Sequence, residues 1–353
     1  MSSSFVSNFG TALVRKLSPE AAHKATLRAL SFGLGGRSKQ PSDPVLETTL
    51  FGMPFMNPVG LAAGFDKDAL VPDAMLRLGL GFVEVGTLTP LAQPGNPKPR
   101  IFRLPEDGAV INRLGFNNGG HGPALTRLEK RARAGRLGIV GVNIGANKDS
   151  DDRINDYVLG VERFKHLADF FTVNISSPNT PGLRGLQDKD QLAALLALTA
   201  DARGDDGPPL LLKVAPDLDE QGVSDIADLL KRSAFDGLIV SNTTIDRPAS
   251  LQSVAKGEAG GLSGRPLFEP STQMLRNFYQ ALDGAMPLIG VGGIASGADA
   301  YTKIKAGASL VELYSALTYG GPPLIDDIVA DLAALVKADG FTNVSDAVGA
   351  DYK

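Results

Sequence analysis

The chain has 353 residues, of which 43% are hydrophobic and 21% are charged. This is the composition of a globular protein, so wholesale disorder is excluded, and no apolar run approaches the roughly 18 residues of a membrane-spanning helix. The chain has no cysteine, which excludes disulfides, thiolate nucleophiles and iron–sulfur clusters, and its three histidines argue against a His-built metal site. A net charge of −4 argues against a nucleic-acid-binding surface. Any catalysis must therefore use side chains other than cysteine, or a bound organic cofactor.

The N-terminal end differs from the rest of the chain in charge. Residues 1–40 carry a net charge of +5, so the remainder carries −9. Apolar residues from Phe5 to Leu17 share one helical face, and Ser18 and Pro19 are typical of the start of a second helix, which glycines from Gly33 onward end. One interpretation is a helical hairpin that packs on the main domain. The basic bias favours the other, a peripheral membrane foot.

From about residue 58, apolar runs alternate with amphipathic stretches. The runs span residues 59–63, 81–88, 138–144, 171–176, 210–215, 238–242, 288–292 and 310–314. Most are continuously apolar, as in parallel strands that are buried on both faces. Helical patterns follow at residues 69–78, 188–202, 220–233, 270–282, 298–305 and 324–337. Eight such units predict a (β/α)8 TIM barrel at residues 41–353, with residues 1–40 as an N-terminal helical extension.

A doubly wound open sheet is the alternative fold. It lacks support because no Gly-x-Gly-x-x-Gly follows the first strand. Two insertions interrupt the rhythm: residues 90–120 are Pro-rich, with β-like pieces at 100–104 and 110–114, and residues 246–266 are Gly-rich. Both follow strands, so they belong to the face where barrel enzymes have their active sites, unless they are merely long loops.

Polar residues recur at the predicted strand ends. One asparagine there usually caps a helix or shapes a turn, but five are present: Asn112, Asn143, Asn174, Asn179 and Asn242. Amide groups offer a donor and an acceptor side by side, which suits a pyrimidine or a flavin ring.

Glycines gather near the last two strands. Residues 290–294 read Gly-Val-Gly-Gly-Ile, and Gly264 precedes them. Backbone N–H groups at this end of a barrel commonly bind phosphate. Simple turns that close the barrel would give the same sequence pattern.

These segments together resemble the dihydroorotate dehydrogenases of the membrane-associated, quinone-using class (class 2). The resemblance covers essentially the whole chain and is most specific at residues 62–68, 102–107, 112–116, 174–184, 241–243 and 260–267. The soluble class uses a cysteine as its base. This chain has none, which supports the quinone-using class.

The resemblance assigns three groups of residues. FMN is expected to contact Ala62, Ala63, Gly64, Phe65, Asp66, Thr87, Asn143, Asn174, Lys213, Ser241, Gly264, Gly293, Tyr314 and Ser315. Dihydroorotate is expected to contact Lys67, Asn112, Arg113, Leu114, Gly115, Phe116, Asn174, Asn179, Asn242 and Thr243. The quinone is expected near His23, Arg103 and Tyr314, and Ser177 matches the catalytic base.

The implied reaction is oxidation of (S)-dihydroorotate to orotate in de novo pyrimidine biosynthesis. Ser177 removes the C5 proton while C6 delivers a hydride to flavin N5, and a membrane quinone accepts the electrons. We expect a monomeric peripheral membrane protein without a metal, at the cytoplasmic face of a bacterial inner membrane, because the N-terminus resembles no presequence or signal peptide. Two alternatives are a cofactor-free lyase or isomerase that uses Lys67 or Lys213, and a flavin-binding scaffold without turnover.

Overall fold

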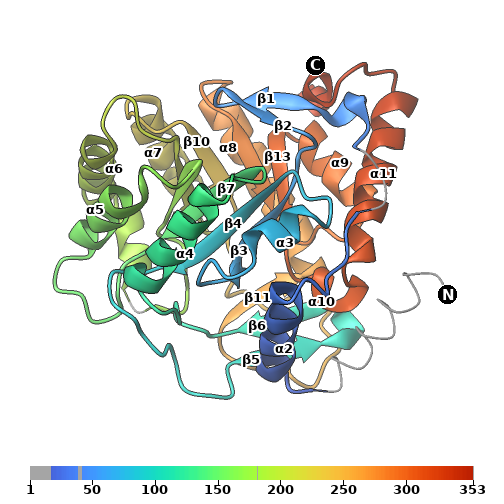
Figure 1. The fold of residues 1–353 in the computed structure, drawn as a ribbon. Coiled ribbons are helices and arrows are strands. Elements are labelled where there is room, and N and C mark those ends of the chain that lie inside the picture. Colours follow the sequence, from blue (N-terminus) through green and yellow to red (C-terminus); the bar gives the residue numbers. More distant parts are fainter. Residues whose placement is uncertain (1–16, 39–41, 181, 353) are drawn as a thin grey trace.

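Eight parallel strands close into a barrel in the computed structural model, which describes residues 17–38, 42–180 and 182–352 (Figure 1). In chain order they are β3 (Val59–Asp66), β4 (Phe82–Leu88), β7 (Ile139–Ile144), β8 (Phe170–Asn174), β9 (Leu210–Val214), β10 (Gly237–Val240), β12 (Leu288–Val291) and β13 (Ala308–Leu313). The closing pair is β13 with β3, in which Glu312 lies opposite Gly60. All eight predicted strands are present, so the TIM-barrel prediction is confirmed.

Helices surround the barrel, as expected when each parallel strand returns through a helix. They are α3 (Pro72–Leu76), α4 (His121–Arg133), α5 (Arg153–Phe164), α6 (Lys189–Arg203), α7 (Glu220–Lys231), α8 (Phe268–Leu282), α9 (Gly297–Lys305), α10 (Leu317–Gly320) and α11 (Pro323–Ala338). Short 3-10 turns occupy Pro44–Leu46, Pro105–Asp107, Leu183–Gln187, Arg265–Leu267, Val344–Ala347 and Ala350–Tyr352. The six predicted helices are present, and α4, α5 and α10 were not predicted.

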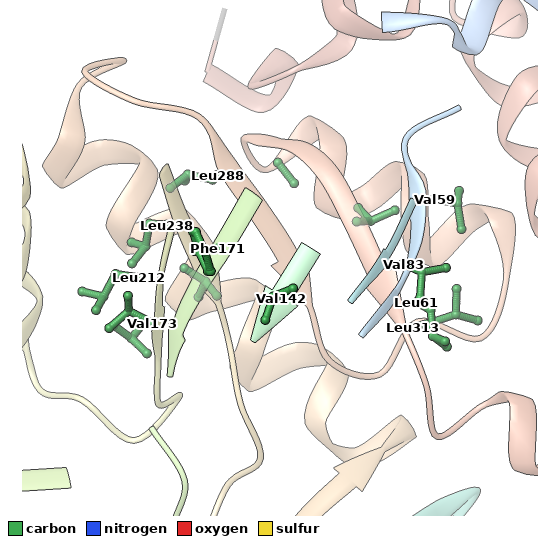
Figure 2. Packing of buried hydrophobic residues seen from close by; sticks show 14 of the residues in the cluster. Val59, Leu61, Val83, Val142, Phe171, Val173, Leu212, Leu238, Leu288 and Leu313 are labelled. Carbon is green, nitrogen blue, oxygen red and sulfur yellow. The ribbon is translucent and has the colours of Figure 1, made fainter. Parts of the chain in front are cut away.

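The main hydrophobic core lies between the strands and this ring of helices. Val83, Val142 and Val173 are fully buried there, and Figure 2 shows such outward-facing side chains on successive strands. Because outward and inward positions alternate along a strand, the intervening residues face the barrel interior. Glu84 and Asn143 are such intervening residues, and both are fully buried.

Aromatic side chains fill one end of the barrel. A hairpin of β1 (Thr48–Leu50) and β2 (Met53–Phe55) covers that end (Figure 1). Phe55 meets Phe82 edge to face at 5.6 Å, and Phe82 meets Phe170 at 6.1 Å. This apolar plug closes the amino ends of the strands, which leaves their carboxyl ends for a site.

A small antiparallel sheet covers the carboxyl ends of the barrel strands. There β5 (Ile101–Leu104), β6 (Ala109–Asn112) and β11 (Gly261–Gly264) form an antiparallel sheet in the order β11-β6-β5. Both predicted insertions contribute to it, so they are more than loops. The helix α2 (Pro19–Ser31) lies beside this sheet at the end opposite the β1–β2 hairpin (Figure 1).

An ion pair attaches α2 to the rest of the molecule. Arg100 donates to both carboxylate oxygens of Glu20, at 2.9 and 3.3 Å, and Arg103 donates to the carbonyl of Leu17. The helix begins at Pro19 as expected, while most of the other predicted N-terminal helix (Phe5 to Leu17) lies outside the described residues. None of the described helices is both long and apolar enough to cross a membrane.

Candidate active site

One large cavity, of about 1530 Å³, joins the carboxyl ends of the strands to the inner side of α2. It exceeds the roughly 300–1,000 Å³ that is usual for a single small-molecule site. Most of the predicted site residues line it: His23, Ala62, Ala63, Gly64, Phe65, Lys67, Thr87, Arg103, Asn112, Leu114, Gly115, Phe116, Asn174, Ser177, Asn179, Lys213, Ser241, Asn242, Thr243, Gly264, Gly293, Tyr314 and Ser315. The fold therefore collects residues from all parts of the chain at one cavity.

Three predicted residues do not line this cavity. Asp66 is fully buried and accepts hydrogen bonds from the backbone amides of Leu70 and Val71, at 2.7 Å each, so its carboxylate shapes the loop after β3. Arg113 pairs with Glu258 at 2.7 Å. Asn143 lies behind the cavity wall, where its oxygen accepts from Thr87 and Asn174. For Asp66 and Asn143 the geometry favours an indirect role through their neighbours.

The asparagines at the strand ends form one hydrogen-bonded group. Asn174, at the end of β8, donates to Thr87 at 3.1 Å and to Asn143 at 3.3 Å. Asn242 donates to Asn174 at 3.4 Å and to the Ser176 hydroxyl at 2.9 Å. Such a network fixes the orientation of each amide, so the cavity presents preset donors and acceptors to a flat polar ligand.

Ser177 lies on the loop that follows β8, and it is buried. Its hydroxyl accepts from the backbone amide of Asn179 at 3.3 Å. Arg184, which the sequence analysis did not single out, holds this loop: it donates to the carbonyl of Ser176 and to Asp217, at 3.2 and 2.9 Å. The arrangement fixes the backbone that carries Ser177.

Lys67 supplies a positive charge to the same cavity. Its ammonium group donates to the carbonyl of Gly64, and burial lowers its pKa to about 8. The group is therefore mostly charged at neutral pH, yet close enough to its pKa to exchange a proton. This makes Lys67 suited to hold an anionic ligand.

A second charged group lies in the barrel interior below the amides. Lys213 on β9 donates to Glu84 on β4 at 3.0 Å and to Glu312 on β13 at 3.3 Å, and all three side chains are buried. Glu84 and Glu312 were not predicted from the sequence, although a single charge inside an otherwise apolar strand was an available signal. Lys213 and Glu312 reach the cavity, so the floor of the cavity is ionic.

The predicted phosphate site is a patch of bare backbone beside two hydroxyls. A side chain at Gly264 would place its Cβ 2.4 Å from the carbonyl oxygen of Gly108, and one at Gly293 would collide with the backbone of Phe268 at 2.5 Å. Both glycines have positive φ, at 93° and 77°. Ser315 donates to Ser263 at 2.8 Å in the same wall. Such a surface suits a phosphate, which needs close approach to donors.

The α2 end of the cavity is aromatic. His23 meets Phe65 edge to face at 5.2 Å, and Phe65 meets Tyr314 at 5.8 Å. Burial, helped by the charge of Lys67, lowers the pKa of His23 to about 3, so its imidazole is neutral at physiological pH. This end therefore suits an uncharged ligand. Within residues 17–38, 42–180 and 182–352, no three His, Asp or Glu side chains gather in a way that could hold a metal ion.

His23, whose pKa is lowered in the fold, should make the protein acid-sensitive. The unfolded chain binds a proton at His23 below about pH 6.5, whereas the folded chain does not, so stability falls as the pH falls, by up to about 1.4 kcal/mol per pH unit. In His23→Gln this contribution is absent, and urea unfolding should change less between pH 7 and pH 5 than in the parent protein. The surface variant His166→Gln serves as the control. An equal change in His23→Gln and the parent would show that His23 titrates normally in the fold.

Comparison with known proteins places this chain in a family. The sequence model described as "Dihydroorotate dehydrogenase" matches residues 45–336. A curated protein of Parvibaculum lavamentivorans named "Dihydroorotate dehydrogenase (quinone)" is 58% identical over 96% of this chain and 97% of its own length. A protein of the same name from Azorhizobium caulinodans is 55% identical over 95% of this chain and 96% of its own.

Solved structures agree with the sequence comparison. The crystal structure of DHODH from Eimeria tenella in complex with ferulenol superimposes with a TM-score of 0.93 at 42% identity, and the match covers 95% of this chain and 96% of that one. The ligand-free structure from the same organism gives a TM-score of 0.92. The match covers the barrel and nearly the whole chain. At 42% identity the two proteins share more than a fold. The chain belongs to the dihydroorotate dehydrogenase family.

Proposed function

We propose that this enzyme oxidises (S)-dihydroorotate to orotate in de novo pyrimidine biosynthesis, with FMN as its redox cofactor and a membrane quinone as electron acceptor. The observation that carries the proposal is the single cavity that joins Ser177 and Lys67 to an aromatic end under α2. The names of the bacterial relatives support both the substrate and the quinone.

The residues present fit FMN. The bare backbone at Gly264 and Gly293 suits the phosphate, and the preset amide of Asn174 with the ammonium of Lys213 suits the polar edge of the ring. When bound, FMN supplies a ring that accepts a hydride at N5 and passes electrons onward, chemistry that the side chains of this chain cannot perform.

Substrate binding falls to the residues around Ser177. Lys67 offers its charge to the substrate carboxylate, and Asn112, Asn179 and Asn242 offer amide groups to the ring edges of the pyrimidine. Asn179 also donates to the oxygen of Asn112 at 3.4 Å, which keeps the two together. In this proposal Ser177 removes the C5 proton of dihydroorotate, while the positive charge of Lys67 stabilises the negative charge that develops on the substrate.

The quinone is proposed to enter along α2. His23 is neutral and lies against Phe65, while the cavity wall there also includes Ala25, Ala29 and Leu30. Just beyond the end of the helix, Phe32 and Leu34 are 80% and 76% exposed. We infer that residues 1–40 form the membrane contact of a monomeric, peripheral protein. The cytoplasmic face of a bacterial inner membrane stays a prediction.

Anaerobic spectroscopy tests the reaction directly. The purified protein should show a flavin absorbance band that dihydroorotate bleaches and a soluble ubiquinone analogue restores. Bleaching without recovery by the quinone would assign a different electron acceptor. A colourless protein would contradict the cofactor, and with it the proposed reaction.

The same assay assigns the base. In Ser177→Ala, bleaching by dihydroorotate should slow by about 10²–10⁴-fold because general base catalysis is lost, while the flavin stays bound. Ser233→Ala, two residues after the end of α7 and not among the cavity-lining residues, should bleach at the parent rate. Parent-like bleaching by Ser177→Ala would show that another group takes the proton.

Membrane contact can be tested at the tip of α2. Phe32→Asp combined with Leu34→Asp should weaken binding to anionic lipid vesicles by at least tenfold, because two exposed apolar side chains become charged. Leu159→Asp combined with Leu198→Asp, two exposed residues on the barrel helices α5 and α6, is the matched control. If the double variant co-sediments with vesicles like the control, the membrane contact lies elsewhere on the molecule.

A further inference from the structure

Three charged side chains meet inside the barrel, and their charges do not cancel. Glu84, Lys213 and Glu312 come from β4, β9 and β13, and their side chains are at most 5% exposed. Two carboxylates and one ammonium carry a net charge of −1 if all are ionised. An uncompensated charge in a buried site is costly, and a shared proton is the usual remedy.

The two carboxyl groups have unequal surroundings. Glu84 accepts hydrogen bonds from Lys213 and from the backbone amide of Ala63, both at 3.0 Å, from the Thr172 hydroxyl, and from Asn143 at 3.4 Å. Glu312 accepts from Lys213, through Oε2 at 3.3 Å, and a hydrogen-bond interaction with Glu84 helps to raise its pKa. Its Oε1 is buried without a partner among the described residues, and Glu312 lines the cavity whereas Glu84 does not.

The charges around Glu312 agree with this asymmetry. Glu84 from β4 and Lys213 from β9 are the charged groups that face it, while β12 and β3 place Val291 and Gly60 opposite it. Burial, reinforced by the Glu84 carboxylate, raises the pKa of Glu312 to about 8. Burial would also raise the pKa of Glu84, but Lys213 and the hydrogen bonds outweigh it and lower that pKa.

We propose that Glu312 carries a proton in the resting enzyme, so that the floor of the cavity is neutral beneath the cofactor ring. This inference rests on the proposed FMN site and names a residue that tunes it. Glu312 lines the cavity, and among the described residues its Oε1 has no hydrogen-bond partner, as expected where a buried carboxyl is not held in its ionised form.

The protonation state of Glu312 affects how readily the bound cofactor is reduced. A hydride brings one hydrogen nucleus and two electrons, so the ring gains one negative charge when it is reduced. A neutral floor with Lys213 stabilises that charge, whereas an ionised Glu312 opposes it. Reduction should therefore draw a proton onto Glu312 at any pH where it has lost one, which couples the cofactor's potential to this carboxyl.

Infrared spectroscopy of the wild-type holoenzyme and of Glu312→Gln tests the proton itself, without reference to turnover. The wild-type protein at pH 7 should show the C=O stretch of a buried protonated carboxyl, which should fade as the pH rises through about 8. The band should be missing in Glu312→Gln and present in Glu129→Gln, a control on the outer face of α4. A wild-type spectrum without that band at pH 7 would overturn the proposal, and so would a Glu312→Gln spectrum that keeps it. If Glu312→Gln fails to fold, the loss of the wild-type band as the pH rises through about 8 decides.

A potential titration tests the coupling between Glu312 and the cofactor. Above about pH 8 the midpoint potential of wild-type enzyme should fall with pH twice as steeply as below it, because reduction then takes up a second proton. Glu312→Gln, which keeps a donor but cannot ionise, should retain the shallow slope throughout. An identical pH profile in the two proteins would overturn the proposal while leaving the FMN enzyme intact; a protein without flavin would instead contradict the proposed function.

Discussion

A buried ion pair across the inside of the barrel sets the position of the site. Lys213 and Glu84 lie on strands that are not neighbours, and their contact at 3.0 Å spans the interior at the level where the apolar filling ends. Below them, Phe82 and Phe170 fill the amino ends of the strands. Above them lies the cavity, which Lys213 itself lines, so the ion pair is the boundary between a packed core and a cavity. Removal of one partner would leave a buried charge, which typically costs 3–5 kcal/mol.

The cavity above this floor has two chemically different ends. Around Ser177 it is lined by amides and by the ammonium of Lys67, which suits a charged, flat substrate. Under α2 it is lined by a neutral imidazole, aromatic rings and small apolar side chains, which suits an uncharged ring. The patch of bare backbone at Gly264 and Gly293 also lines this cavity. The proposed reaction agrees with this division. A charged substrate matches the end around Ser177, and an uncharged electron acceptor matches the end under α2.

The fold could be predicted from sequence because its strongest signal is local. Each parallel strand is buried on both faces, so each appears as an apolar run, and all eight were found. The helices α4 and α5 were missed because α4 is rich in charges and α5 follows a polar loop, which weakens the helical pattern. β11 is a short Gly-rich strand that forms only through its antiparallel pairing with β6, and a tertiary partner of this kind has no local signature.

The site was predicted less evenly, for physical reasons. Residues that follow a motif at a strand end, such as Asn174 and Ser177, do reach the cavity. The direction of a side chain within a motif was not predictable: Asp66 turns back to bind its own loop, and Arg113 pairs with a residue of the second insertion. Glu312 was missed because its importance depends on two charges from distant strands. Such a cluster exists only after the barrel has closed.

The division of the cavity into two ends is the central claim, and a variant on α2 tests it most directly. Ala25 lines the cavity on α2, whereas Ala21 is exposed on the same helix. In stopped-flow measurements, Ala25→Trp should leave flavin reduction by dihydroorotate unchanged and slow reoxidation by a quinone at least tenfold, while Ala21→Trp should change neither. Slowed reduction with unchanged reoxidation in Ala25→Trp would contradict the account.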